Sequence, residues 1–220
     1  MKTIVIAPHP DDETLGAGGT LLKRKREGSV IAWLIVTSIS EQDGWSRDRV
    51  KNRQLEIKEI SNLYDFDEVY QLNFPATSLD TVPIRDIIKA ISGVFNEFRP
   101  DEVFLPNPTD VHSDHRIAFE AAVSCTKCFR YSHIKRVLAY ETLSETDFSL
   151  SPGRRFSPNV FVNIEDFLEG KLKAMGIYKS ELGEFPFPRS QKAITALANV
   201  RGAASGFMAA EAFELLRVRS

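Results

Sequence analysis

The sequence predicts an α/β fold, a Rossmann-like and mainly parallel sheet with helices on both faces, as a single domain over residues 1–220. Short runs rich in β-branched residues alternate with longer amphipathic stretches along most of the chain. This order is typical of parallel strands joined by crossover helices. The length suits one such domain, and no internal repeat, low-complexity tract or interdomain linker interrupts it.

The expected strands are short and apolar. The first, at residues 2–7, contains Ile4, Val5 and Ile6 without polar alternation, which indicates burial on both faces. The run at residues 30–37 has the same character. Further strands are expected at residues 69–72, 102–106, 135–141 and 161–164.

Amphipathic helices are expected between these strands. The first begins at residues 11–13, whose carboxylates favour a helix N-terminus, and runs to about residue 28. Residues 47–64 carry an apolar stripe at helical spacing, and a helix at 82–98 ends before Pro100. The remaining helices are expected from Arg116 onward, at 167–178 and at 191–201.

Composition narrows the possible partners. The net charge is −2, so no broad basic surface indicates nucleic acid or an anionic membrane. No apolar run is long enough to span a bilayer. The N-terminus begins directly in a strand without a secretory signal pattern, and the expected location is the cytoplasm.

Cys125 and Cys128 are the two cysteines. Their C-x-x-C spacing occurs in redox and zinc sites, but no second pair or nearby histidine pair completes a zinc site. A helical pattern over residues 117–124 continues through them. We therefore expect two reduced, partly buried helix cysteines rather than a chemical site.

Two polar clusters follow predicted strands. One comes directly after the first strand and the other follows the strand at residues 102–106. Ligands bind outside the carboxyl ends of the strands in open α/β sheets, which makes these clusters candidates for a site. They contain three of the four histidines of the chain and are formed by His9, Asp11 and Asp12, and by His112, Asp114 and His115.

The two clusters together hold the ligands for a catalytic metal. His9, Asp12 and His115 supply two imidazoles and a carboxylate, a common zinc set that leaves positions open for water and substrate. Zinc lowers the pKa of a coordinated water, and Asp11 lies beside a ligand, where it can accept the proton. These residue types therefore predict a metal-dependent hydrolase.

His112 is expected to reach the same pocket without sharing the metal. There it would stabilise an oxyanion and protonate a leaving amine, with Asp114 orienting its ring and favouring its charged form. Structural roles stay open for the individual residues. Asp11 and Asp12 also suit a helix N-terminus, and a loop histidine is often only solvated.

The Gly-Ala-Gly-Gly segment at residues 16–19 is not expected to bind a nucleotide. Phosphate-binding glycines of the Rossmann type follow their strand directly, whereas the first of these glycines comes nine positions after Ala7, the end of the first strand. Close packing of the first helix on its surroundings is the preferred interpretation.

The two clusters resemble those of the LmbE-like/PIG-L family of metal-dependent N-acetylglucosaminyl deacetylases. The likeness rests on His-Pro-Asp-Asp-Glu at 9–13 and His-x-Asp-His at 112–115, with weaker matches in the Arg53 helix and at 201–202 and 210–213. It implies a hydrolase that removes the N-acetyl group from a small-molecule amino-sugar conjugate. It implies Zn²⁺ as the cofactor, and Fe²⁺ or Co²⁺ would suit the same ligands.

The resemblance also implies that Arg53 and Arg47 bind substrate, although both could be surface arginines, Arg53 paired with a helix glutamate. Ser113 replaces the usual proline of the second motif and leaves every functional group in place. Ala209 stands where some relatives have a tyrosine that assists the oxyanion. That task would then fall to the metal, to His112 or to another group.

Three alternatives remain open from the sequence. The protein could be an amidase on a different acylamide, a non-catalytic Rossmann-type sugar- or nucleotide-binding protein, or a structural metalloprotein with a closed site. The loops at residues 40–47, 144–158 and 184–190 are expected to shape specificity. A homo-oligomer is expected by analogy with relatives.

Overall fold

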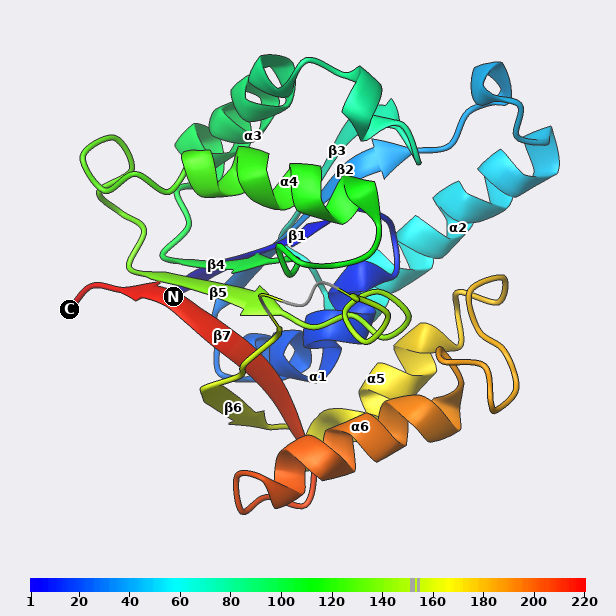
Figure 1. Ribbon diagram of the computed structural model, residues 1–220, viewed down its shortest axis with the longest axis vertical. Helices are drawn as coiled ribbons and strands as arrows, with labels where there is room; N and C mark the ends of the chain where they lie inside the picture. Colours follow the sequence, from blue (N-terminus) through cyan, green and yellow to red (C-terminus); the bar gives the residue numbers. More distant parts are fainter. Residues whose placement is uncertain (151–152, 154) are drawn as a thin grey trace.

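The computed structural model describes residues 1–150, 153 and 155–220. Within these residues the chain forms a seven-stranded sheet of order β3-β2-β1-β4-β5-β7-β6 (Figure 1). The strands are β1 (Lys2–Ala7), β2 (Val30–Ser38), β3 (Glu68–Pro75), β4 (Glu102–Leu105), β5 (Arg136–Tyr140), β6 (Val160–Asn163) and β7 (Ala210–Val218). The helices are α1 (Asp12–Arg26), α2 (Arg47–Tyr64), α3 (Ile84–Phe98), α4 (Ser113–Ser124), α5 (Leu168–Met175) and α6 (Gln191–Ala203).

The prediction of a mainly parallel α/β sheet is confirmed. Strands β1 to β5 pair in parallel, and only β7 runs antiparallel to its neighbours β5 and β6 within the described residues. Strand β7 was not predicted. Glu211, Glu214 and Arg217 interrupt its apolar residues, so it lacks the continuous run that identifies the central strands.

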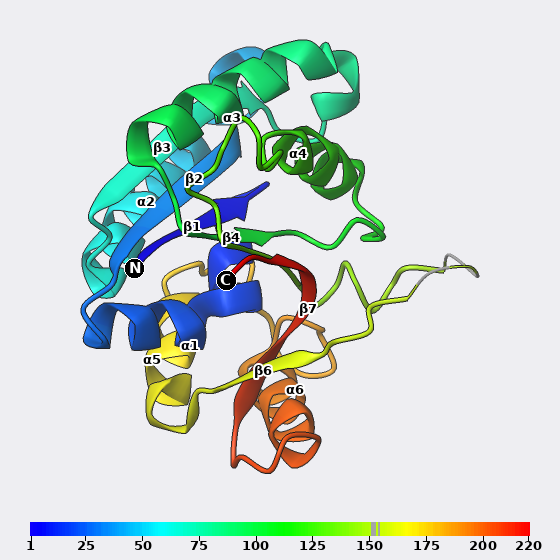
Figure 2. The same ribbon diagram turned by 90° about the vertical axis from the view of Figure 1, so that its left-hand side faces the viewer.

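Helices cover both faces of the sheet, which explains the continuous apolar strands (Figure 2). Along β1, Ile4 and Ile6 belong to the core beneath α3 and α4. Val5 and Ala7 belong to the core beneath α1, α2, α5 and α6. Because successive side chains of a strand point to opposite faces, a strand covered on both sides is apolar at every position.

The glycines of α1 serve packing, as expected. A Cβ added at Gly16 would lie 2.1 Å from Tyr140 Cδ2, and one added at Gly19 would lie 2.8 Å from the Ile164 side chain. The glycines therefore let α1 approach β5 and the segment after β6 more closely than any other residue type would allow.

Helix α4 differs from the prediction at both ends. It begins at Ser113 instead of Arg116, and it ends at Ser124, so the helix does not continue through the cysteines. Cys125 is buried, whereas Cys128 is exposed, and both are free thiols. In the part of the chain that the structure describes, no helix combines the length and apolarity needed to cross a bilayer.

Candidate active site

The two polar clusters meet because β1 and β4 are adjacent parallel strands. The turn at residues 8–11 leads from β1 into α1, and the loop at residues 106–112 leads from β4 into α4 (Figure 1). Both connections therefore leave the same carboxyl edge of the sheet. The early start of α4 places His115 in its first turn, where the helix holds the imidazole in a defined direction.

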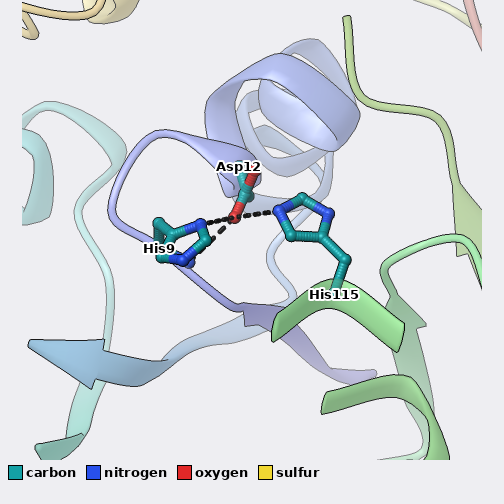
Figure 3. A group of neighbouring side chains, drawn as sticks. All are labelled: His9, Asp12 and His115. Atoms are coloured by element: carbon teal, nitrogen blue, oxygen red, sulfur yellow. Dashed lines mark hydrogen bonds and ion pairs between the residues drawn. The ribbon is translucent and has the colours of Figure 1, made fainter. Parts of the chain in front are cut away.

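Figure 3 shows His9 and His115 on opposite sides of the Asp12 carboxylate. Asp12 Oδ2 lies 3.6 Å from His9 Nδ1 and 3.3 Å from His115 Nε2. One ligand atom from each of the three residues lies within 4.8 Å of the other two. Two imidazole nitrogens and a carboxylate oxygen at this separation match the donor set of a catalytic zinc site.

A carboxylate holds each imidazole on the side away from Asp12. His115 Nδ1 donates to Asp110 Oδ2 at 2.8 Å, and His9 Nε2 donates to Asp114 Oδ2 at 2.9 Å. When the two rings are neutral, these contacts leave the lone pairs on His115 Nε2 and His9 Nδ1. Carboxylates in this position orient the histidine ligands of metal ions, so the residues fit a divalent cation.

The pKa shifts of Asp12 and His115 also suit a bound divalent cation. Burial by itself would raise the pKa of Asp12, but the neighbouring His115 and His9 lower it below its usual range. Burial would lower the pKa of His115, whereas the carboxylates of Asp12 and Asp110 raise it well above the usual value. The pocket thus stabilises positive charge at the point where the three ligand atoms meet.

The structure corrects the role expected of Asp114. Its carboxylate contacts His9 rather than His112, and it also accepts the backbone N–H groups of Thr77 at 2.7 Å and Leu79 at 3.1 Å. The backbone N–H of Asp114, in turn, donates to His112 Nδ1 at 3.1 Å. Although His9, His112 and Asp114 also lie close enough to hold a cation, the oxygens of Asp114 are already engaged.

The surroundings of His112 do not favour the charged form that we expected from the sequence. Burial is the main cause that lowers its pKa to about 4, and the nearby His9 lowers it further against the opposing effect of Asp114. The His112 and His9 ring centroids are 4.6 Å apart. Since Nδ1 accepts a hydrogen bond, the proton of the neutral ring is on Nε2, which makes His112 a neutral donor.

Asp11 lies in a backbone conformation that few residues other than glycine adopt, with φ of 139°. Conformations of this kind persist where surrounding contacts hold them, often at active sites. Its backbone N–H donates to Glu13 Oε2 at 3.1 Å, and Arg189 Nη1 donates to its Oδ2 at 2.8 Å. Burial and the adjacent Asp12 raise the pKa of Asp11 well above its usual value, although Arg189 opposes this.

His9, Asp11, Asp12, His112 and His115 line one pocket of about 180 Å³. The three loops expected to shape specificity each contribute a residue to it, namely Trp45, Glu145 and Arg189. Residues 151, 152 and 154 of the loop at 144–158 lie outside the described residues.

Arg53 lines the pocket and Arg47 does not. Arg53 Nη1 donates to the Pro10 carbonyl at 2.8 Å, and the guanidinium also pairs with Glu181. Arg47 is exposed at the start of α2, outside the pocket lining, so it is poorly placed for the expected substrate contact. Arg49, one helical turn before Arg53, lines the pocket instead.

The segment with Ala209 does not reach this pocket. Glu211 accepts the backbone N–H groups of Gly19 at 2.9 Å and Thr20 at 2.7 Å, and it pairs with Lys171 at 2.7 Å. These contacts join α1, α5 and β7. Ala209 itself is not among the residues that line the pocket.

Sequence reasoning missed Asp110, Glu181 and Arg189. Asp110 lies two residues before His112, and this proximity to a recognised cluster was its one signal. Glu181 and Arg189 belong to a segment without a motif, and folding alone brings them to Asp11 and Arg53.

Comparisons with known proteins agree with this geometry. The family model described as GlcNAc-PI de-N-acetylase, PIG-L, matches residues 4–126. Diacetylchitobiose deacetylase of Thermococcus kodakarensis is 28% identical over 96% of this chain and 81% of its own length. Probable N-acetyl-alpha-D-glucosaminyl L-malate deacetylase 2 of Bacillus cereus is 22% identical over 81% and 82%.

A solved structure shares the fold. N,N'-diacetylchitobiose deacetylase from Pyrococcus horikoshii has a TM-score of 0.78 to this chain at 23% identity, covering 98% of this chain and 84% of its own. This likeness extends beyond residue 126, where the family match ends, so nearly all of this chain shares the fold of the corresponding part of that protein.

Proposed function

The chain belongs to the PIG-L family, and from this membership we propose that it is a metal-dependent N-deacetylase. It would hydrolyse the N-acetyl amide of an N-acetylglucosamine-type conjugate to acetate and a free amine. The observation that carries the proposal is the meeting of three cation ligands and the buried Asp11 in one pocket. Relatives named for diacetylchitobiose and for a GlcNAc-malate support the amino-sugar substrate.

His9, Asp12 and His115 would hold the cation through Nδ1, a carboxylate oxygen and Nε2. Zn²⁺ suits two imidazoles and a carboxylate, and Fe²⁺ or Co²⁺ suits the same atoms. Such a cation, when bound, makes water more acidic and polarises the amide carbonyl.

Asp11 is the proposed general base. Burial and the adjacent Asp12 raise its pKa above the usual carboxyl value, and a more basic carboxylate accepts a proton from water more readily. Arg189 donates to Oδ2 and leaves Oδ1 to accept the proton of the attacking water. The departing nitrogen needs one proton when the C–N bond breaks, and Asp11 can return the proton that it accepted.

His112 is the proposed oxyanion donor. The backbone N–H of Asp114 fixes Nδ1 as an acceptor, so Nε2–H is free to donate towards the pocket. A neutral donor can stabilise developing negative charge in a partly buried site without the cost of burying an imidazolium. This role replaces the charged acid that we expected from the sequence.

The test combines elemental analysis with an amine-release assay on N,N'-diacetylchitobiose and N-acetylglucosamine. We expect one metal ion per chain and amine release that chelation abolishes and Zn²⁺ restores. Asp11→Asn should keep the metal and lose about 10²- to 10⁴-fold in kcat, the usual contribution of a general base. Asp12→Ala should lose both metal and activity.

Two results would contradict the proposal. A chain that binds neither Zn²⁺ nor Fe²⁺ after reconstitution cannot use the ligand set described above. Amine release from other acylamides, with no activity on any amino sugar, would support the proposed active site but contradict the proposed amino-sugar substrate.

A further inference from the structure

Trp45 places an exposed aromatic ring in the lining of the pocket. Its side chain is 38% exposed. Several large apolar side chains are exposed in the described residues. Of these, only Trp45 lines the pocket that contains His9, Asp12 and His115. An indole in this position offers a flat apolar face together with a polar N–H to an incoming ligand.

The turn that carries Trp45 is held by its own hydrogen bonds. Ser40 Oγ accepts the backbone N–H of Asp43 and donates to its carboxylate at 2.6 Å. Gly44 follows with φ of 86°, a left-handed conformation that favours glycine, and the Trp45 N–H donates to the Ser40 carbonyl. Ser46 then caps α2. A preformed turn reduces the entropy lost when a ligand binds.

The rest of the lining suits a sugar ring. Ile39, Ile57 and Ala76 are apolar lining residues, and Gln54 adds a side-chain amide. A pyranose presents C–H groups on its faces and hydroxyl groups at its edge. It therefore matches an aromatic face surrounded by apolar contacts and a few polar groups.

The arginines of the pocket are already paired. Arg49, Arg53 and Arg189 all contact Glu181, at 2.7, 2.5 and 3.1 Å, and Arg189 also contacts Asp11. A carboxylate or phosphate on the ligand would compete with Glu181 for these guanidinium groups. The pocket thus favours an uncharged group beside the N-acetyl sugar.

We propose that Trp45 is a stacking platform for a second, uncharged sugar ring joined to the sugar whose N-acetyl group is removed. This inference rests on the proposed function and narrows its substrate. The substrate class is an uncharged disaccharide or oligosaccharide that contains N-acetylhexosamine, rather than a conjugate with an acidic partner.

The kinetic test compares one-ring and two-ring substrates on the Zn²⁺-loaded enzyme. Trp45→Ala should lower kcat/KM for N,N'-diacetylchitobiose about tenfold, mainly through KM, and should lower it less for N-acetylglucosamine. Trp45→Phe should recover part of the loss because it keeps an aromatic face. Phe129→Ala removes an aromatic residue that is 77% exposed and lies outside the pocket lining. It should change kcat/KM for neither substrate.

A binding measurement separates this inference from the proposed function. The chain has two tryptophans, and Trp33 is fully buried, so Trp45 dominates any ligand-induced change in emission. N,N'-diacetylchitobiose should shift the emission of Asp11→Asn protein in a saturable way, and adding Trp45→Phe should remove the shift. Saturable binding without turnover on any amino sugar would contradict the deacetylase and support the platform.

Three outcomes would overturn the platform itself. One is an equal loss for both substrates in Trp45→Ala, and another is no loss for either substrate while the enzyme turns over normally. The third is tighter binding of N-acetylglucosamine 6-phosphate than of N,N'-diacetylchitobiose, because it would show that an acidic group finds a partner in the pocket.

Discussion

Arg189 Nη1 lies 2.8 Å from Asp11 Oδ2, although 178 positions of sequence separate the two residues. Other groups hold the same guanidinium in place. Glu181 contacts it at 3.1 Å and Glu145 at 3.5 Å, while its Nε donates to Ser144 Oγ at 2.8 Å. A residue from a distant loop therefore orients the proposed base.

Replacing Arg189 should slow the reaction more than it weakens substrate binding. Arg189→Ala frees the Asp11 carboxylate to rotate, and a misplaced catalytic group costs about 10²-fold in rate. Arg189→Lys should recover little, because an ammonium cannot make the same fork of contacts. Steady-state kinetics on the metal-loaded enzyme measure this. Arg85→Ala, at an exposed site on α3, is the matched control, and an unchanged kcat in Arg189→Ala would refute the orienting role.

Removing the carboxylate behind His115 should weaken metal binding without unfolding the protein. Asp110 accepts from His115 Nδ1 at 2.8 Å and from Thr146 Oγ1 at 2.6 Å. Asp110→Asn should lower the affinity for Zn²⁺ by about 10- to 100-fold, the usual effect of losing such a partner. Competition with a chromophoric chelator gives the affinity. Asp166→Asn, on an exposed carboxylate, should have no effect, and equal affinities in the two variants would argue against Asp110 as a positioning residue.

Glu13 should make stability depend on pH near neutrality. Burial raises its pKa from 4.5 to about 7, against hydrogen bonds from Thr14 and Tyr178. Between these values the folded protein keeps a proton that the unfolded chain releases, so stability falls as the pH rises and then levels off above about 7.

The variant Glu13→Gln tests this linkage. The unfolding free energy of the wild type, measured relative to the variant, should fall by up to roughly 3 kcal/mol between pH 4.5 and pH 7. Urea unfolding in the presence of a chelator at a series of pH values provides the comparison. Glu41→Gln, at an exposed site, controls for the loss of one carboxylate. Parallel curves for wild type and Glu13→Gln would show that Glu13 does not titrate in this range.

Two glycines in helices should respond in opposite directions to the same substitution. Gly16→Ala would drive a methyl group into Tyr140, whose ring cannot easily move because its hydroxyl donates to the Ile6 carbonyl at 2.7 Å. The unfolding free energy should fall by about 1–3 kcal/mol. Gly93→Ala on α3 meets no atom within 4 Å and should raise it by about 0.5–1 kcal/mol. Thermal and urea unfolding measure both, and a stabilised Gly16→Ala would show that the contact is not tight.

The central strands and the long helices were predictable because their signals are local. The run Ile4-Val5-Ile6 is apolar at every position, and the helix at residues 47–64 was placed with its observed bounds. Strand β7 was missed because its burial comes from its neighbours β5 and β6 rather than from its own pattern. The start of α4 was placed too late because His112 caps the helix with a ring nitrogen, a less familiar signal than a serine or aspartate cap.

The proposed metal ligands were also foreseeable, since His9, Asp12 and His115 stand in two short motifs at the ends of adjacent strands. The partner of Asp114 was not. The sequence places Asp114 beside His112, but α4 turns its carboxylate towards His9 and leaves only its backbone N–H for His112. Sequence proximity could not decide between these contacts, because both His9 and His112 lie within reach of Asp114 in the first turn of α4.

By itself, the sequence determined the α/β class, the two motifs and the residue types that can hold a divalent cation. These properties depend on periodicity and on neighbours a few positions apart. Only the tertiary structure decided which nitrogen of each histidine ligand faces a carboxylate, that burial lowers the pKa of His112, and that Arg189 contacts both Asp11 and Glu181. Burial and long-range contact set these outcomes, and both arise only when distant segments pack together.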